Sequence, residues 1–268
     1  MTRHRMEALA LLTVALVLGI CPRSSATRMA GRDAIHMDLY EVLRKNVVDG
    51  KVNYGRLKRV SGPVLKRYVD NLSEAKLERQ PGESKWYEDN VLAFWINAYN
   101  ACAIAGIIEH YPSVKSVQDI PGFFTRQRWP VAGEKLSLDD IEGKIRSFKD
   151  PRVHFVLVCG ARSCPPLQPY SMLGYDLQKD LERITRQVVN DPRYVQIIPK
   201  TKRLRLTRIM SWYKQDFVSK YGSLEAFLLR YLDEPKRGQL RAGGYTIEFM
   251  PYDWSLNDVS KPARPSAR

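Results

Sequence analysis

The hydrophobic and polar positions of this 268-residue chain follow helical spacing over much of its length. Apolar residues three or four positions apart, with charged residues between them, are typical of helices that cover a core with one face. Five segments have this pattern: 36–46, 60–77, 176–190, 210–221 and 224–232. We therefore expect several amphipathic outer helices.

A further segment, Val91 to Ile108, is apolar on nearly every face. It is long enough to raise a transmembrane interpretation, but two asparagines and a tyrosine in its middle favour a helix buried in a protein core. A buried amide without a hydrogen-bond partner costs about 1–3 kcal/mol, so Asn97 and Asn100 must bond to groups nearby. They either hold the backbone of a neighbouring loop, or line and orient a functional site.

Strand patterns are fewer. Residues 194–199 and 203–207, with Pro-Lys-Thr-Lys at the turn between them, predict a hairpin, and apolar and basic residues alternate in its second arm. Residues 245–250 predict a last strand. The run HFVLVCG, 154–160, is rich in β-branched and apolar residues and ends at a glycine, which indicates an interior strand.

A short helix should begin after Ser137, because Ser137 to Asp140 match a capping box in front of two spaced isoleucines. Asp49-Gly50 indicates a turn, and residues 79–85 a loop. Together these patterns predict an α+β fold, with a small, mainly antiparallel sheet packed against a buried central helix and several outer helices.

The N-terminus has the pattern of a secretory signal peptide. Two arginines precede an apolar run from Ala8 to Cys21, and Ser24 and Ala26 provide small residues at cleavage-site spacing. An uncleaved anchor is the alternative, although the run is short for a bilayer, which needs about 20 residues. We expect residues 1–26 to be a signal peptide and the protein to be periplasmic or extracellular, with no stable membrane span after cleavage.

The net charge of +14 indicates an anionic partner. An exported protein does not meet cytosolic nucleic acid. We therefore expect the partner to be an anionic envelope polymer or peptide, and we expect no nucleic-acid partner. Arg203 and Arg205 alternate with leucines in the predicted hairpin, which makes one face basic. That face is either solvated or a strip that binds polyanions. Residues 258–268 form a basic tail that we expect to be disordered.

The stretch HFVLVCGARSCPPL, His154 to Leu167, contains residue types that suit several kinds of site. Its histidine and cysteines could bind zinc, but their spacing differs from the common knuckle and no fourth ligand is evident, so no metal or cofactor is expected. A disulfide between Cys159 and Cys164 is geometrically possible in an exported protein. Cys159 and Cys102 also suit the role of small core residues.

A nucleophile with its base is the sharper hypothesis for this stretch. A thiol reacts as thiolate, and a neighbouring imidazole can take its proton, so Cys164 and His154 form a candidate pair. Ten residues of separation allow the two side chains to meet but do not require it. Pro169 leaves no room for a long helix after Cys164, so the helix N-terminus that often lowers a thiol's pKa is missing here.

Five ordered motifs resemble the DUF547 family of unknown function. They are FWINAYN at 94–100, LDDIEGKI at 138–145, DPRVHFVLVCGARSCPPL at 150–167, SWYKQDF at 211–217 and YDWSLN at 252–257. The resemblance covers residues 87–257, and residues 27–86 then form an N-terminal helical segment packed on that domain. It implies an α+β domain of exported bacterial proteins, with a distant similarity to papain-like thiol hydrolases.

The resemblance also singles out individual positions. They are Asn97, Asn100, Glu142, Arg152, His154, Cys164 and Pro165. Family members often carry a histidine directly after the glutamate of the second motif, where this chain has Gly143. If that histidine were a catalytic base elsewhere in the family, this chain would lack it.

From these residues we expect an exported, thiol-dependent hydrolase or acyltransferase that acts on an envelope amide or ester. Cys164 would be the nucleophile and His154 the base, with Glu142 or an asparagine amide orienting the imidazole and Arg152 holding an anionic group of the substrate. The rival is a non-enzymatic envelope-binding or scaffold domain, in which the same side chains form a buried polar network. A Cys164 sulfur beside a His154 nitrogen at an open cleft favours the enzyme, and a Cys159–Cys164 disulfide or a sealed site favours the rival.

Overall fold

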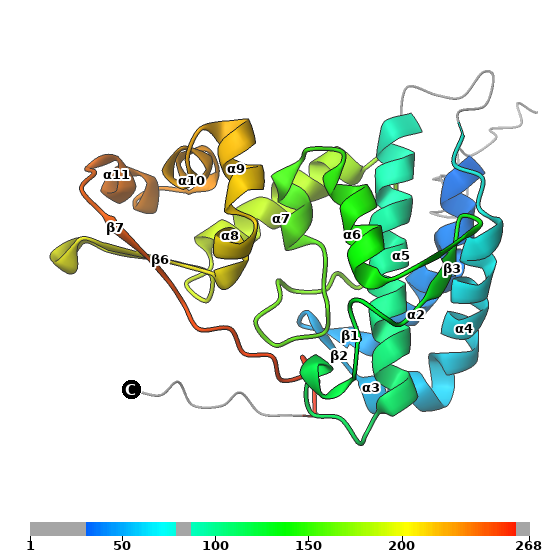
Figure 1. Ribbon diagram of the computed structural model, residues 1–268. Coiled ribbons are helices and arrows are strands. Elements are labelled where there is room, and N and C mark those ends of the chain that lie inside the picture. The colour runs from blue at the N-terminus through cyan, green and yellow to red at the C-terminus, as the bar shows by residue number, and fades with distance from the viewer. Residues whose placement is uncertain (1–30, 79–86, 261–268) are drawn as a thin grey trace, which may run out of the picture.

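A computed structural model of the chain describes residues 31–78 and 87–260 (Figure 1). The expected signal peptide, the whole of the 79–85 loop and residues 261–268 of the tail lie outside the described residues. The α-helices are α2 (Met37–Asn46), α3 (Tyr54–Arg56), α4 (Gly62–Asn71), α5 (Tyr87–His110), α6 (Leu138–Arg146), α7 (Leu177–Asn190), α8 (Arg208–Trp212), α9 (Lys214–Tyr221), α10 (Leu224–Tyr231) and α11 (Lys236–Arg241).

Shorter elements connect these helices. The strands are β1 (Val47–Val48), β2 (Lys51–Val52), β3 (Trp129–Val131), β4 (Glu134–Leu136), β5 (Val195–Ile198), β6 (Arg203–Leu206) and β7 (Thr246–Phe249). Tighter 3₁₀ turns are η1 (Gly31–His36), η3 (Leu72–Glu74), η4 (Val117–Asp119), η5 (Pro151–Phe155) and η6 (Pro199–Thr201), and η2 (Leu57–Ser61) is a π-helical turn.

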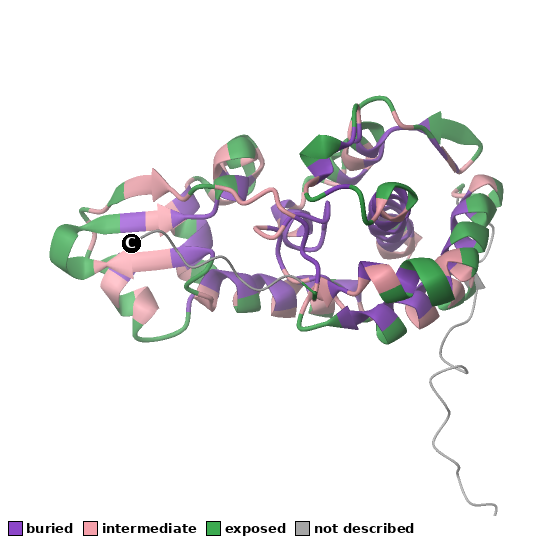
Figure 2. Ribbon diagram, turned by 90° about the horizontal axis from the view of Figure 1, so that it is seen from below, coloured by how far each residue is buried: buried purple, intermediate pink, exposed green. Residues whose placement is uncertain are grey.

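Helix α5 forms the centre of one side of the molecule, between α4 and α6 (Figures 1 and 2). All its residues from Val91 to Ile107 are buried, because they are apolar on nearly every face. Within the described part of the chain, α5 alone is long and apolar enough to cross a membrane, and 94% of its 18-residue apolar stretch is buried inside the protein. It is therefore a core helix, as the sequence predicted.

The strands form three small sheets. The predicted hairpin is confirmed, since β5 pairs antiparallel with β6, with Val195 opposite Leu206. The last strand is confirmed as well, and β7 joins the other edge of β6 in parallel. β1 pairs with β2 and β3 with β4, both antiparallel. The α+β class is thus confirmed, and the largest sheet makes its main helix contacts with α7 and α11.

The strand predicted at 154–160 is wrong. The chain instead forms η5 and then an irregular segment, residues 156–176, which passes through the middle of the molecule and is largely buried (Figure 2). Buried backbone groups need partners, but side chains of α5 provide several of them here. Asn100 Nδ2 donates to the carbonyl of Val156 at 2.9 Å, and its Oδ1 accepts from the amide of Val158 at 2.8 Å.

Several local predictions hold, with adjusted limits. The capping box is present, since the Ser137 hydroxyl accepts from the amide of Asp140 and α6 follows directly. The Asp49-Gly50 turn joins β1 to β2 with both residues at positive φ. The 210–221 segment is helical but divides at Tyr213 into α8 and α9. The 60–77 pattern is realised as a π turn, α4 and a short 3₁₀ turn.

Candidate functional site

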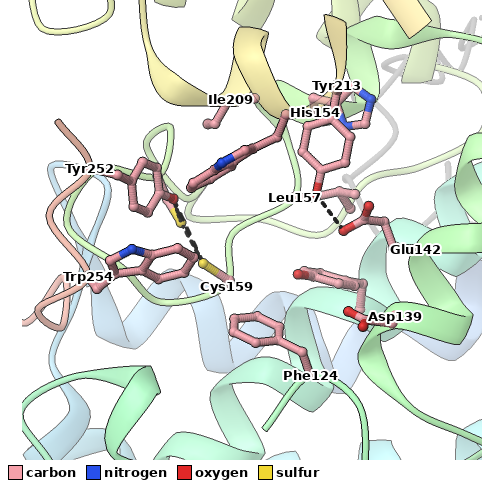
Figure 3. A pocket seen from close by; sticks show the side chains of 13 residues that line it. Phe124, Asp139, Glu142, His154, Leu157, Cys159, Ile209, Tyr213, Tyr252 and Trp254 are labelled. Atoms are coloured by element: carbon pink, nitrogen blue, oxygen red, sulfur yellow. Dashed lines mark hydrogen bonds between the residues drawn. The ribbon is translucent and has the colours of Figure 1, made fainter. Parts of the chain in front are cut away.

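A cavity of about 380 Å³ lies between α6, the α8–α9 junction, the irregular segment and the C-terminal segment after β7 (Figure 3). Its aromatic lining consists of Tyr99, Phe124, Trp212, Tyr213, Tyr252 and Trp254. Its other lining residues are Asp139, Glu142, His154, Leu157, Cys159, Cys164 and Ile209. The volume is within the range of small-molecule sites, about 300–1,000 Å³.

The two cysteines at this cavity are positioned by the C-terminal segment. Residues 160–163 run beside residues 253–257, with the Arg162 amide donating to the Ser255 carbonyl at 2.7 Å and the Asn257 amide donating to the Gly160 carbonyl at 2.8 Å. Gly160 has φ +90°, and a Cβ there would lie 2.3 Å from Ile107 Cδ1 on α5. The turn between the cysteines therefore requires glycine, and the pairing brings Tyr252 to the thiols.

Cys164 is surrounded by hydrogen-bond donors. Its Sγ lies 3.1 Å from Cys159 Sγ and 3.2 Å from Tyr252 Oη. Burial by itself raises the pKa of the Cys164 thiol, but hydrogen bonds with Cys159, with Tyr252 and with the backbone of Ala161 outweigh burial and lower this pKa to about 7. The hydrogen bond to Cys164, followed by burial, raises the pKa of Cys159 well above its usual value. Of the two thiols, Cys164 is therefore the one that ionises first, while Cys159 keeps its proton.

His154 lies on η5, whose N-terminus is capped by the Asp150 carboxylate. Its Nε2 lies 2.9 Å from Asp216 Oδ2, and its ring stacks on that of Tyr213 with centroids 3.8 Å apart. Burial lowers the pKa of His154 to about 4, and the hydrogen bond to Asp216 opposes this shift only in part. The imidazole is therefore neutral near pH 7 and fixed in orientation.

Asp216 is the residue that sequence reasoning missed. The expectation that Glu142 or an asparagine amide orients the imidazole is corrected, because the partner of His154 Nε2 is Asp216 on α9. Asp216 also accepts two hydrogen bonds from Arg146, at 2.8 and 2.9 Å. The signal was available, since Asp216 lies in the SWYKQDF motif, but nothing in that motif names its partner.

Glu142 contacts His154 only through Tyr213. Tyr213 Oη donates to Glu142 Oε2 at 2.9 Å, and burial raises the pKa of Glu142. Asp139, one helical turn earlier on α6, also lines the cavity, and burial followed by the neighbouring Asp140 raises its pKa. At Gly143 a Cβ would meet no atom within 4 Å, so the position where family members often have histidine is open space.

The expected contact between Cys164 and His154 is not formed. The thiol bonds to Cys159 and Tyr252, and the imidazole bonds to Asp216. Figure 3 shows Cys159 and Tyr252 on one side of the cavity and His154 and Glu142 on the other. A substrate in the cavity would lie between the two groups.

The other predicted site residues lie away from the cavity. Arg152 is 12% exposed and pairs with Asp150, its Nη2 lying 2.6 Å from Oδ2, so the expected role in holding an anionic substrate group is corrected to an internal ion pair. Asn97 Nδ2 donates to the Met172 carbonyl at 2.8 Å, and Asn100 bonds to the backbone at Val156 and Val158. Both amides thus hold the irregular segment.

Three cysteines lie in the described part of the chain, where a disulfide, a metal site and a place in the core were the alternatives to a nucleophile. Cys102, Cys159 and Cys164 are free thiols. Cys102 is buried in α5, and burial raises its pKa far above the ordinary value. Cys159, expected to be a core residue only, also lines the cavity. Among the described residues, no group of three or more His, Cys, Asp or Glu side chains could hold a metal ion.

A family model described as protein of unknown function, DUF547, matches residues 83–188. This range contains α5, α6, η5 and both cavity cysteines, whereas Asp216 and Tyr252 lie beyond it. Searches of curated proteins and of solved structures found no match to the chain.

Proposed function

Because this chain is a member of the DUF547 family through residues 83–188, whose description names no activity, we propose a function from the chemistry of the cavity. The protein is a thiol-dependent hydrolase or acyltransferase that acts on an amide or ester, with Cys164 as the nucleophile. The observation that carries the proposal is the position of the Cys164 sulfur, at the wall of a cavity and within 3.2 Å of two hydrogen-bond donors. Thiolates rather than thiols are nucleophiles.

The proposed reaction uses both sides of the cavity. The Cys164 thiolate attacks the carbonyl carbon, a carbon–sulfur bond forms, and the bond to the leaving amine or alcohol breaks. Glu142 meets the substrate as a carboxylate, and its raised pKa favours uptake of a proton from solvent, which it gives to the leaving group before taking one from the water or acceptor that attacks the thioester. His154 and Asp216 act as positioning residues, since the imidazole stacks on the Tyr213 ring that donates to Glu142.

Export and the envelope substrate are part of the same proposal. They rest on the pattern of residues 1–26, and the anionic envelope partner rests on the net charge of +14. The rival, a non-enzymatic envelope-binding domain, is favoured by the separation of His154 from Cys164. The experiment must therefore distinguish a reactive thiol from a structural one.

Alkylation by iodoacetamide, followed from pH 5 to 10 and assigned by peptide mapping, tests the proposal. We expect Cys164 to react faster at pH 7 than a model thiol, while Cys102 and Cys159 stay protected in the folded protein. Tyr252→Phe removes one donor, so the midpoint of Cys164 labelling moves to higher pH. The matched variant Tyr245→Phe, at a half-buried tyrosine outside the cavity, leaves it unchanged. Hydrolysis of a panel of p-nitrophenyl esters is then measured for two serine variants. We expect Cys164→Ser to be inactive and Cys102→Ser to be active.

The rival function replaces this one if native Cys164 proves disulfide-bonded to Cys159, or reacts no faster than the model thiol. It also does so if Cys164→Ser hydrolyses the esters as fast as the parent. Thermal melts of each variant establish that it is folded, so that loss of structure is not read as loss of reactivity.

A further inference from the structure

We infer that the cavity binds a substituted ammonium group, and that the amide or ester acted on carries this positive charge near its reacting carbonyl. The second part rests on the proposed function, whereas the binding itself does not. The inference reverses the expectation from the sequence, in which Arg152 was to hold an anionic group. Arg152 lies away from the cavity in its ion pair with Asp150.

The charges at the cavity have the opposite sign to those of the whole protein. The chain carries +14, yet the described residues that line the cavity include the carboxylates Asp139 and Glu142 and no lysine or arginine. His154 is neutral at pH 7 because burial lowers its pKa to about 4. A thiolate at Cys164 adds further negative charge. An anionic ligand would meet repulsion here, and a cation attraction.

The aromatic lining provides the second half of such a site. Figure 3 shows Phe124, Tyr252 and Trp254 around the space that Asp139 and Glu142 face from the other side. The faces of aromatic rings attract cations, and rings arranged around a cavity recognise alkylated ammonium groups, which shed water more readily than a primary ammonium does. The carboxylates across the cavity add a longer-range attraction.

These rings are held in place and remain accessible. The ring centroids of Tyr252 and Trp254 lie 4.6 Å apart. The ring centroid of Trp212 lies 4.7 Å from that of Tyr252 and 5.5 Å from that of Trp254. Trp212 lines the cavity and is 46% exposed. Arg146 already lies over the Tyr213 ring, with its guanidinium carbon 5.3 Å from the centroid.

A matched pair of probes tests the inference. Choline and 3,3-dimethylbutan-1-ol have nearly the same shape, but only choline carries a charge. We expect calorimetry on the reduced protein to show choline binding at least about tenfold more tightly than the neutral alcohol, because cation–π and carboxylate contacts act only on the cation. Glu142→Gln and Trp212→Leu should each weaken choline binding by about threefold to tenfold and leave the alcohol unchanged.

The control is Glu134→Gln, which removes the same charge from an exposed position on β4 that pairs with Lys144 outside the cavity. It should leave choline binding unaltered. Equal binding of the two probes, failure of both to bind, or an equal loss in Glu134→Gln would overturn the inference. Trp212→Leu keeps the test valid if Glu142→Gln is unstable, since Trp212 is already exposed.

Iodoacetamide labelling of Cys164, measured on the same samples, separates this inference from the proposed function. A reactive Cys164 in a protein that does not prefer choline overturns the ammonium site and leaves the thiol chemistry standing. A protein that prefers choline but has an unreactive Cys164 overturns the thiol chemistry and leaves the ammonium site standing.

Discussion

Asn97 uses both ends of its amide on a single backbone residue. Its Nδ2 donates to the Met172 carbonyl and its Oδ1 accepts from the Met172 amide, each at 2.8 Å. Asn100 serves Val156 and Val158 in the same way. An asparagine side chain offers one acceptor and two donors, so it can replace a neighbouring strand for a segment that has none. These two amides thereby hold the segment that carries the cavity cysteines.

We predict that Asn97→Leu lowers the free energy of unfolding by about 1–3 kcal/mol, because the Met172 carbonyl and amide remain buried without partners. Urea unfolding measures this, with Asn71→Leu at the exposed end of α4 as the control. An Asn97→Leu protein as stable as the parent would contradict the role given to this amide.

Among the elements, α6 and the β5–β6 hairpin differ in the charge that they present. Helix α6 places acidic side chains at the cavity, and the hairpin places basic side chains on the surface. The capping box at Ser137 sets the start of α6, and one side of that helix then presents Asp139 and Glu142 to the cavity. On β6, Arg203 Nε lies 3.2 Å from Oε1 of Glu248 on β7, and Arg205 Nε lies 4.0 Å from Oε2 of the same residue. Two arginines therefore share one carboxylate. The hairpin therefore keeps an excess of positive charge on its surface.

We predict that this excess supports only weak, salt-sensitive adhesion to polyanions. The double variant Arg203→Glu with Arg205→Glu should lose binding to dextran sulfate at low salt, whereas the parent should lose it once added salt shortens the screening length to below about 10 Å. A double variant at Lys66 and Arg67 on α4, with the same change in charge, is the control. Equal binding by the parent and the hairpin variant at low salt would show that the arginines are merely solvated.

At the scale of the molecule, two histidines of the described residues are buried in neutral form. Burial lowers the pKa of His36 to about 3 and that of His154 to about 4, from 6.5. His36 bonds to Tyr68 Oη through Nδ1 at 2.8 Å. Below pH 6.5 the unfolded chain takes up protons that the folded chain does not, so stability falls with pH. Glu142, whose pKa is raised, has the opposite effect.

We predict that the melting temperature is highest above about pH 6.5 and falls as the pH drops towards 4. His36→Gln removes one titrating group and should flatten this dependence, even if it lowers the melting temperature at pH 7. Differential scanning calorimetry across the range measures both. The same slope in His36→Gln and in the parent would mean that His36 is not neutral in the folded state.

Local patterns were sufficient to predict the longer helices and the β5–β6 hairpin, but not α11 or the β3–β4 pair. The core helix α5, the cap at Ser137 and the β5–β6 turn follow from the spacing of apolar residues and from side chains a few positions away. The candidate residues Cys164, His154 and Glu142 were selected from the sequence, and all three line one cavity. Their type and motif were enough to select them.

The partners of those residues were decided by the tertiary structure alone. Tyr252 reaches Cys164 across 88 positions and Asp216 reaches His154 across 62, and no periodicity connects residues so far apart. The 154–160 run has the composition of a strand, but Asn100 satisfies its backbone and replaces the ladder. Composition describes a segment's own preferences, whereas the hydrogen bonds it makes depend on which distant groups packing brings to it.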